Sequence, residues 1–498
     1  MANPLKKLAG QTAIYGLSTI LPRLLNYALV PLLTRQFTNP EDFGINTQIY
    51  SYISFLNVVL TYGMETAFFN FLNKSENKNV VYSTTLISLL STSLLFILLG
   101  LFSSGYVANE LGYEKNINFI QWMVLIIASD AIATIPFARL RAEQRPLKFM
   151  IIKTANILTN VGLTVFFIYF CKHAYEKDLQ EQTTSFLGSC YNPQIGIGYA
   201  FLANLLANAL TLLLLSKEFV GFKFTFDKAL WLQMMKYAFP LLIVGLAGMV
   251  NETFDRLILG QLLPADIGLR ELGIYGACYK ISILMTLFRQ AFQYAAEPFF
   301  FNHAKNEDSK KLNALVMKYF IIACSFLFLA TMLNLSWIKY IVAEPYWAGL
   351  AVVPILLLAN LFFGVYYNLS IWYKLSGQTK YGVYITLIGA AITLVINFVF
   401  IPRFSYMASA WATLLSYGGM MAVSYFLSQK YYGAKYNVRS FVFFLGFALV
   451  FYFVSLLWKD KMGNIAIELV LNNILLLVYC WLFIKFELPN LKRINVTS

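Results

Sequence analysis

The chain of 498 residues has few charged residues, few cysteines and very few histidines. Only 12% of its positions are charged, 59% are hydrophobic, and the mean hydropathy is +0.63. A soluble protein carries about twice that charged fraction, so a soluble globular fold is excluded. Two histidines exclude a histidine-built metal site, and five cysteines do not make a disulfide scaffold. The sequence also lacks Walker A, GxSxG and HExxH motifs, so it offers no phosphate loop, nucleophile elbow or zinc-protease site.

The formal net charge is +14, which in a soluble protein would suggest a nucleic-acid partner. Here the basic residues are scattered between long apolar runs, and no nucleic-acid-binding motif accompanies them. We therefore expect no nucleic acid among the partners.

Long apolar runs dominate the chain. A helix needs about 20 residues to cross a hydrocarbon core about 30 Å thick, and about fourteen segments meet that length. The predicted spans are 8–34, 43–70, 80–102, 118–139, 147–170, 194–216, 236–263, 272–301, 314–336, 347–373, 381–401, 405–428, 439–457 and 464–484. The pattern predicts an all-α integral membrane protein. The first span contains Arg23 and lacks a small-residue cleavage site, so we interpret it as a retained helix and not as a signal peptide.

Lys and Arg are unequally divided between the two sets of loops. If the N-terminus is cytoplasmic, that side holds about 24 of them and the other side about 9. Because cytoplasmic loops are the ones enriched in Lys and Arg, we expect both termini in the cytoplasm. The longest outward loop, roughly 171–193, is bordered by Cys171 and Cys190. A disulfide between them stays open, although two unrelated thiols are the favoured interpretation.

The start of the chain resembles its middle. A shift of about 229 residues superimposes Gly44 on Gly273 and Asn26 on Asp255 without gaps. Six predicted spans separate the copies, so both enter the membrane from the same side, as parallel repeats do. We predict two pseudo-symmetric six-helix lobes, 1–225 and 226–430, followed by two further helices and a tail in 431–498. The alternative is a chance likeness between short Gly-containing turns.

Ionisable side chains interrupt several apolar runs, where each costs roughly 2.5–3.5 kcal/mol on insertion scales. The stretch from Phe239 to Leu263 contains Glu252, Asp255 and Arg256. Glu252 and Arg256 are four residues apart, which allows an ion pair on one helix face. The other charges are Arg23, Asp130, Lys153, Lys280 and Arg289, with Glu65 and Glu297 nearer the cytoplasmic ends of their spans.

Three explanations compete for these charges: structural pairs between helices, long stems that reach the interface, and a polar cavity. Lys153 fits the second explanation. A cavity best fits five residues, of which four are cationic and deep: Arg23, Asp255, Arg256, Lys280 and Arg289. Cations gathered in a chamber attract an anion such as a phosphate, a pyrophosphate or a carboxylated sugar. The residues therefore favour transport of an anionic substrate.

Five short motifs occur in a specific order. They are NETFDRLILG at 251–260, LGIYGACYKI at 272–281, EPFFF at 297–301, IPFARLRAE at 135–143, and the early pair Phe43-Gly44 with GMETA at 63–67. In their order and spacing along the chain, these motifs resemble those of the polysaccharide-transport branch of the multidrug/oligosaccharidyl-lipid/polysaccharide exporter superfamily. The resemblance extends over nearly the whole chain and includes the number of spans.

The resemblance implies six plus six spans around a central cationic cavity, in a flippase of a bacterial inner membrane. Such a flippase moves an undecaprenyl-pyrophosphate-linked oligosaccharide from the cytoplasmic to the periplasmic leaflet by alternating access, for polysaccharide or lipopolysaccharide assembly. Its partners would be this anionic lipid-linked substrate, membrane lipids, a polysaccharide polymerase and glycosyltransferases. It would use no cofactor and would draw on the membrane potential or on an H+ or Na+ gradient.

The roles expected of the charged residues follow from the same resemblance. The anionic head would be held by Arg23, Arg256, Lys280 and Arg289, and Glu252 and Asp255 would orient these cations. Glu65, Asp130 and Glu297, with Glu252 and Asp255, would respond to a gate or a coupling cation.

Two alternatives within the superfamily stay open. One is a lipid II flippase, whose last two spans help to form a groove for the polyprenyl tail. The other is a cation-coupled multidrug exporter, against which the cationic excess counts. A membrane-bound glycosyltransferase or polymerase is less favoured, because the longest loop of about 23 residues is short for a catalytic domain.

Overall fold

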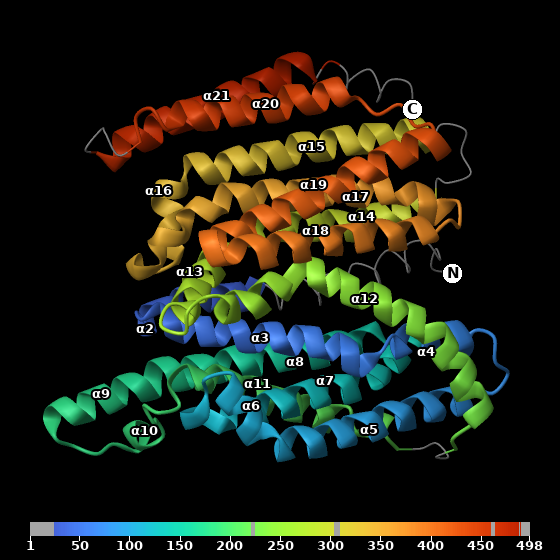
Figure 1. Ribbon diagram of the computed structural model, residues 1–498, viewed down its shortest axis with the longest axis vertical. Helices are drawn as coiled ribbons and strands as arrows, with labels where there is room; N and C mark the ends of the chain where they lie inside the picture. The colour runs from blue at the N-terminus through green and yellow to red at the C-terminus, as the bar shows by residue number, and fades with distance from the viewer. Residues whose placement is uncertain (1–23, 221–224, 303–308, 460–463, 488, 490–498) are drawn as a thin grey trace. The chain divides into compact units, whose positions relative to one another are not determined.

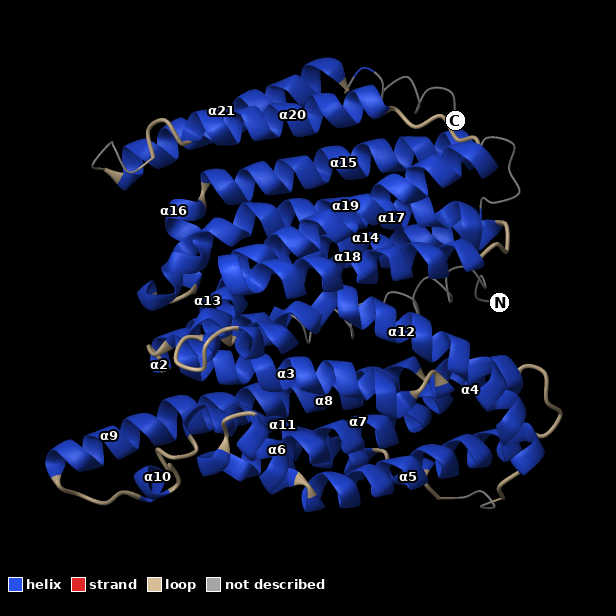
Figure 2. Cartoon of the chain, viewed as in Figure 1, coloured by secondary structure: helices blue, strands red, loops and turns tan. Residues whose placement is uncertain are grey.

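The computed structural model describes residues 24–220, 225–302, 309–459, 464–487 and 489. Within these ranges the chain forms helices and no strands (Figure 2). The predicted all-α class is confirmed.

The helices group into two compact units, Met1–Ala277 with Thr393–Ser409, and Cys278–Ile392 with Ala410–Ser498. Figure 1 labels the α-helices of both units. The first unit contains α2 (Val30–Gln36), α3 (Pro40–Thr61), α4 (Met64–Leu72), α5 (Lys78–Phe102), α6 (Ser104–Glu110), α7 (Ile117–Ala142), α8 (Pro146–Val165), α9 (Lys172–Glu181), α10 (Phe186–Ser189), α11 (Tyr199–Leu214) and α12 (Lys228–Leu262). A π-helical segment, Phe166–Cys171, joins α8 to α9, and short 3-10 helices lie at Glu114–Asn116, Gly196–Gly198 and Ser216–Glu218.

The second unit contains α14 (Ile283–Asn302), α15 (Ser309–Leu333), α16 (Leu335–Ile338), α17 (Val352–Leu375), α20 (Val438–Ser455) and α21 (Ile465–Phe486). Its 3-10 helices lie at Lys339–Ile341 and Glu344–Ala351. Three helices contribute residues to both units: α13 (Gly268–Ile281), α18 (Lys380–Phe404) and α19 (Tyr406–Tyr431). The division into lobes 1–225 and 226–430 stays a prediction.

Ten of the described helical segments are long and apolar enough to cross a membrane, or eleven if α13 and α14, bent by 48°, form one span. The chain is therefore a multi-pass membrane protein. The predicted count of fourteen is not reached by this measure. The first predicted span lies mostly outside the described residues, and α3 and α19 have the length but are more polar.

Local sequence explains where several helices begin and break. The side chains of Asn39, Asn77 and Asp227 accept hydrogen bonds from the first-turn amides of α3, α5 and α12, as N-cap residues do. The predicted span 43–70 is broken between α3 and α4, where Tyr62 and Gly63 both adopt positive φ. Two successive left-handed residues cannot continue an α-helix, so α4 starts a new direction.

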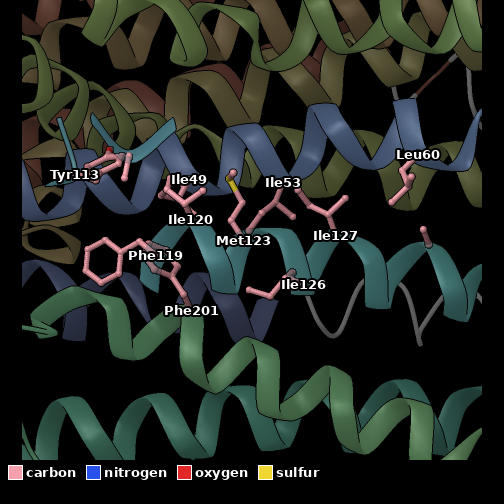
Figure 3. Close-up of a cluster of buried hydrophobic side chains, with 12 residues drawn as sticks. Ile49, Ile53, Leu60, Tyr113, Phe119, Ile120, Met123, Ile126, Ile127 and Phe201 are labelled. Atoms are coloured by element: carbon pink, nitrogen blue, oxygen red, sulfur yellow. The ribbon is translucent and has the colours of Figure 1, made fainter. Parts of the chain in front are cut away.

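A core cluster of the first unit lies between α3, α6, α7 and α11 (Figure 3). Ile49, Ile53, Phe119, Ile127 and Phe201 are buried in it. Phe119 and Phe201 meet edge to face, with ring centroids 5.4 Å apart. Because lipid tails are as apolar as these side chains, close packing rather than the hydrophobic effect holds such helices together.

Helices α3 and α13 cross with almost no space between their backbones. A Cβ atom on Gly44 would lie 2.8 Å from the carbonyl carbon of Leu269, and one on Gly273 would lie 2.8 Å from that of Pro40. Both contacting pairs are related by the same shift of 229 residues, since Pro40 superimposes on Leu269 as Gly44 does on Gly273. Reciprocal contacts of this kind are what a two-fold axis produces. The predicted repeat would give such a reciprocal contact, and the repeat itself stays a prediction.

Candidate functional site

A polar cavity of about 340 Å3 lies inside the first unit. Four helices of the bundle, α3, α7, α8 and α11, supply most of its wall, and α4 supplies one carboxylate. The charged lining residues are Glu65, Asp130, Arg141 and Lys153. The remaining lining residues are Asn57, Ser129, Ala133, Thr134, Phe137, Phe149, Asn156, Asn208 and Thr211. With two carboxylates and two cations, the cavity has a formal charge close to zero.

Asp130 lies in the deeper part of this cavity within a chain of amides. Asn208 Nδ2 donates a hydrogen bond of 3.0 Å to Asp130 Oδ1. Asn156 Nδ2 in turn donates to Asn208 Oδ1 at 3.1 Å and to Thr211 Oγ1 at 2.9 Å. The chain fixes the amide orientation of Asn208, so an N–H donor faces the carboxylate. Asp130 keeps a second carboxylate oxygen for a further partner.

Lys153 lies near Asp130 and interacts with it electrostatically. Its ammonium nitrogen stands 4.3 Å from the centroid of the Phe137 ring, a cation–π contact. The sequence pattern assigned Lys153 to the membrane interface, but its side chain lines the cavity instead. The phenyl face and the carboxylate explain why the ammonium is accommodated there.

The other end of the cavity is bordered by an ion pair between Arg141 and Glu65. The Arg141 guanidinium also lies 5.0 Å from the ring centroid of Phe69. Arg141 follows Asp130 by eleven residues on α7, so the cavity extends about 16 Å along this helix. The pair links the first turn of α4 to the last turn of α7.

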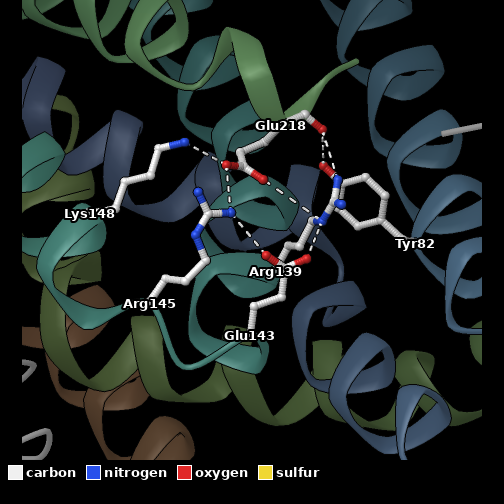
Figure 4. A network of polar contacts seen from close by, with 6 residues as sticks. All are labelled: Tyr82, Arg139, Glu143, Arg145, Lys148 and Glu218. Carbon is white, nitrogen blue, oxygen red and sulfur yellow. Dashed lines mark hydrogen bonds and ion pairs between the residues drawn. The ribbon is translucent and has the colours of Figure 1, made fainter. Parts of the chain in front are cut away.

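Beside this end, a second network joins three cations to a buried carboxylate (Figure 4). Glu218 is only 3% exposed. Its Oε1 accepts from Lys148 Nζ at 2.6 Å and from Arg145 Nη1 at 3.1 Å, and its Oε2 lies 3.8 Å from Arg139 Nε. Tyr82 donates its hydroxyl hydrogen to the Glu218 carbonyl at 2.7 Å. Basic residues of α7, of α8 and of the turn between them thus surround one acidic residue, which follows α11.

Glu143 completes the network at its exposed edge. It accepts from Arg139 Nε at 2.7 Å and from Arg145 Nη1 at 2.9 Å. Partial burial acts to raise the pKa of this carboxyl, but the hydrogen bonds and charges of the two arginines together hold it below its ordinary value.

On α12, Asp255 and Arg256 form a second candidate group. Asp255 is 4% exposed and accepts a hydrogen bond of 2.6 Å from the hydroxyl of Tyr275 on α13. Arg256 Nε lies 3.4 Å from Asp255 Oδ1, and Arg256 Nη2 donates to the backbone carbonyl of Glu252. The ion pair formed is therefore with the adjacent Asp255. The side chain of Glu252 is exposed.

In the second unit, Arg289 is buried on α14, with its guanidinium carbon 4.5 Å from the Phe363 ring centroid. Phe363 itself stacks on Tyr417, with centroids 4.4 Å apart. Gly364 lies against the stem of Arg289, so the small residue makes room for it. Lys280 is half-buried near the end of α13.

The structure thus brings Glu65 and Asp130 into one cavity, and Asp255 and Arg256 into one pair. Arg23 and the side chain of Glu297 lie outside the described residues. Sequence reasoning missed Arg141 as a cavity residue and treated Asn156 and Asn208 as undistinguished polar residues. Their spacing on separate helices carries no local signal that they would converge on Asp130.

A family model described as polysaccharide biosynthesis protein matches residues 8–303, which is more than half of the chain. The chain belongs to this family. The comparison with curated protein sequences gives no match. The family membership confirms the resemblance inferred from the motifs.

Among solved structures, the inward closed conformation of the lipid II flippase MurJ has a TM-score of 0.71 at 13% sequence identity, and the match covers 95% of this chain and 99% of that chain. An inward-facing MATE multidrug transporter of the MOP superfamily has a TM-score of 0.65 at 13% identity, over 83% and 95% of the two chains. The MATE multidrug transporter DinF-BH has a TM-score of 0.57 at 15% sequence identity, and the match covers 86% of this chain and 96% of that chain. At these identities the likeness establishes the fold, which this family member shares with flippases and transporters of the MOP superfamily.

Proposed function

We propose that this protein is a flippase that moves an undecaprenyl-pyrophosphate-linked oligosaccharide from the cytoplasmic to the periplasmic leaflet of a bacterial inner membrane. It works by alternating access, for the assembly of a surface polysaccharide or lipopolysaccharide. One observation carries the proposal: a chain of the polysaccharide biosynthesis protein family has, over 95% of its length, the fold of a lipid flippase.

The anionic head of the substrate is assigned to Arg23, Arg256, Lys280 and Arg289. The surroundings of Arg256 and Arg289 support their choice. Arg256 is held beside the carboxylate of Asp255, and Arg289 lies against the aromatic face of Phe363. Both contacts orient a guanidinium, whose planar fork of N–H donors matches the oxygens of a pyrophosphate. Asp255 is itself held by Tyr275 and so fixes the position of Arg256.

Coupling to a proton or sodium gradient is assigned to Asp130, with Glu65 at the other end of the cavity. A carboxylate in a polar cavity, held by one amide and facing one ammonium, is a group that can exchange a proton or bind a small cation. Exchange of a proton or a cation at Asp130 would alter its hydrogen bond with Asn208, which joins α7 to α11. No cofactor is needed for this cycle.

The test is a flipping assay with the full-length protein in liposomes, using a fluorescent undecaprenyl-pyrophosphate-linked saccharide and a membrane-impermeant quencher. The wild type is expected to expose the label at a rate well above that of protein-free liposomes. Arg256→Gln and Lys280→Gln are expected to lower this rate at least tenfold while eluting as folded protein. Full activity in both variants would refute the assignment of the cations.

A lipid II substrate is the second candidate, because MurJ has the same fold over nearly the whole chain. The same liposomes, loaded with fluorescent lipid II or with a cationic dye, separate the three possibilities. Preferential export of the dye would identify a multidrug exporter and overturn the proposed function.

A further inference from the structure

An apolar groove of about 220 Å3 lies on the second unit, between α15, α17, α19 and α20. Met317, Ile321, Leu369, Met421 and Phe441 contribute to its walls. The groove is open on the surface, because Phe426 beside it is 70% exposed and Val438 is 45% exposed. An apolar groove on a membrane helix bundle fits a hydrocarbon chain.

One end of this groove is closed by the loop between α19 and α20. Tyr436 and Asn437 from this loop line it, and Asn437 caps the first turn of α20 by accepting from the amide of Ser440. The Tyr436 ring packs against that of Tyr425, with centroids 6.3 Å apart. In Figure 1 the adjoining ends of α15, α19 and α20 converge at the right of the view.

Among the residues that the structure describes, the exposed charges beside this end of the groove are basic. Residues 345–459 contain no Asp or Glu at all. Lys435 and Arg439 flank the lining residues Tyr436 to Val438, and both side chains are exposed. Lys310, also exposed, lies 5.2 Å from the ring centroid of Tyr432 on the same loop.

The lysine that lines the groove does not add to this surplus. Lys318 forms an ion pair of 2.5 Å with Glu487, which is 4% exposed. The pair is neutral as a unit, so among the described residues the exposed cations Lys310, Lys435 and Arg439 supply the charge at the groove's end.

We infer that this groove is a binding site for an anionic phospholipid of the surrounding bilayer. One acyl chain lies between α15, α17, α19 and α20, and the phosphate is held by Lys435, Arg439 and Lys310. Charge complementarity selects the occupant, because basic clusters beside membrane helices attract anionic headgroups, each cation contributing roughly a fivefold gain in affinity. The site is separate from the assigned substrate residues and does not rest on the proposed function.

The experiment titrates full-length protein in detergent with phosphatidylglycerol or with phosphatidylcholine of identical acyl chains, and counts bound lipid by native mass spectrometry. Wild type is expected to take up phosphatidylglycerol at a concentration at least fivefold lower than phosphatidylcholine. The double variant Lys435→Gln/Arg439→Gln is expected to lose this preference. Ala422→Phe, which fills the groove from a lining position on α19, is expected to weaken binding of both lipids.

Arg403→Gln is the matched control, since it removes an exposed arginine from the last turn of α18, a helix that contributes no residue to the groove lining. Its titrations should match the wild type. The inference is overturned by equal wild-type affinity for the two lipids, by an equal loss in Arg403→Gln, or by wild-type binding in Ala422→Phe. Displacement of the lipid by inorganic phosphate alone would overturn it as well, since the acyl chain would then contribute nothing.

Discussion

The crossing of α3 and α13 gives a sharp test of the packing, through the substitution Gly273→Ala. The added Cβ would lie 2.8 Å from both the Gly44 nitrogen and the Pro40 carbonyl carbon, and within contact of the Pro40 oxygen. All three atoms are backbone, so no side chain can rotate away to make room. The two helices must move apart, and the core that α3 builds with α7 must follow.

The size of the effect follows from two opposing terms. Replacing Gly by Ala inside a helix gains about 1 kcal/mol of helix propensity. Overpacking a tight contact costs about 1–3 kcal/mol, and more where the backbone has to shift. Because the crowded atoms here are backbone, the cost should fall in the upper part of that range, which leaves a net loss of about 1–2 kcal/mol for Gly273→Ala. Gly44→Ala should cost about the same, because the two glycines occupy equivalent positions in one reciprocal contact.

The assay is thermal unfolding of purified protein in detergent, followed by size-exclusion chromatography after heating. Gly248→Ala on α12 is the matched control, because a Cβ there meets no atom within 4 Å. The control should melt at or above the wild-type temperature, and the crossing variants clearly below it. If Gly273→Ala were as stable as Gly248→Ala, the close approach of α3 and α13 would be wrong.

Three further predictions concern the charged groups. Asp130→Asn should keep a polar contact with Asn208 but remove the charge, so flipping should fall at least tenfold with an unchanged elution profile. Glu218→Gln should lower the melting temperature, because the loss of a buried carboxylate that balances three cations costs about 1–3 kcal/mol after allowance for their exposure. The depressed pKa of Glu143 means that its contribution to stability is present above the unfolded-state pKa and is lost as pH falls through the folded value. Melting temperatures measured from pH 7 to pH 3 should therefore fall less in Glu143→Gln than in the wild type.

The membrane helices could be predicted from the sequence because the bilayer imposes their length and composition. The span predicted at 118–139 corresponds to α7, that at 381–401 to α18, and that at 464–484 to α21, each within a few residues. The start of α12 was predicted eight residues late, since it begins at Lys228 in a polar region. Its N-terminus is fixed by the Asp227 cap, which hydropathy does not register.

The breaks within spans could not be predicted in the same way. Tyr62 and Gly63 interrupt the helix through positive φ angles, and tyrosine gives no sequence signal for a positive φ. The 48° bend between α13 and α14 falls at Ser282, with neither Gly nor Pro at that position. At the bend, Ser282 Oγ donates a hydrogen bond of 2.7 Å to the backbone carbonyl of Tyr279, and serine hydroxyls that bond back to the helix backbone often bend helices.

Spacing along the chain also failed to predict which charges would pair, and burial explains the outcome. Arg256 had Glu252 at the favourable i−4 position, yet its ion pair is with the neighbouring Asp255. Glu252 is exposed, whereas Asp255 is buried and loses far more if left without a partner. The same asymmetry holds for the other carboxylates buried in the described part of the chain: Glu218 contacts Lys148, Glu468 accepts from Ser336, and Glu487 pairs with Lys318. In each case the partner comes from a different helix or loop, because a buried carboxylate selects the donor that the fold brings to it, however distant in sequence.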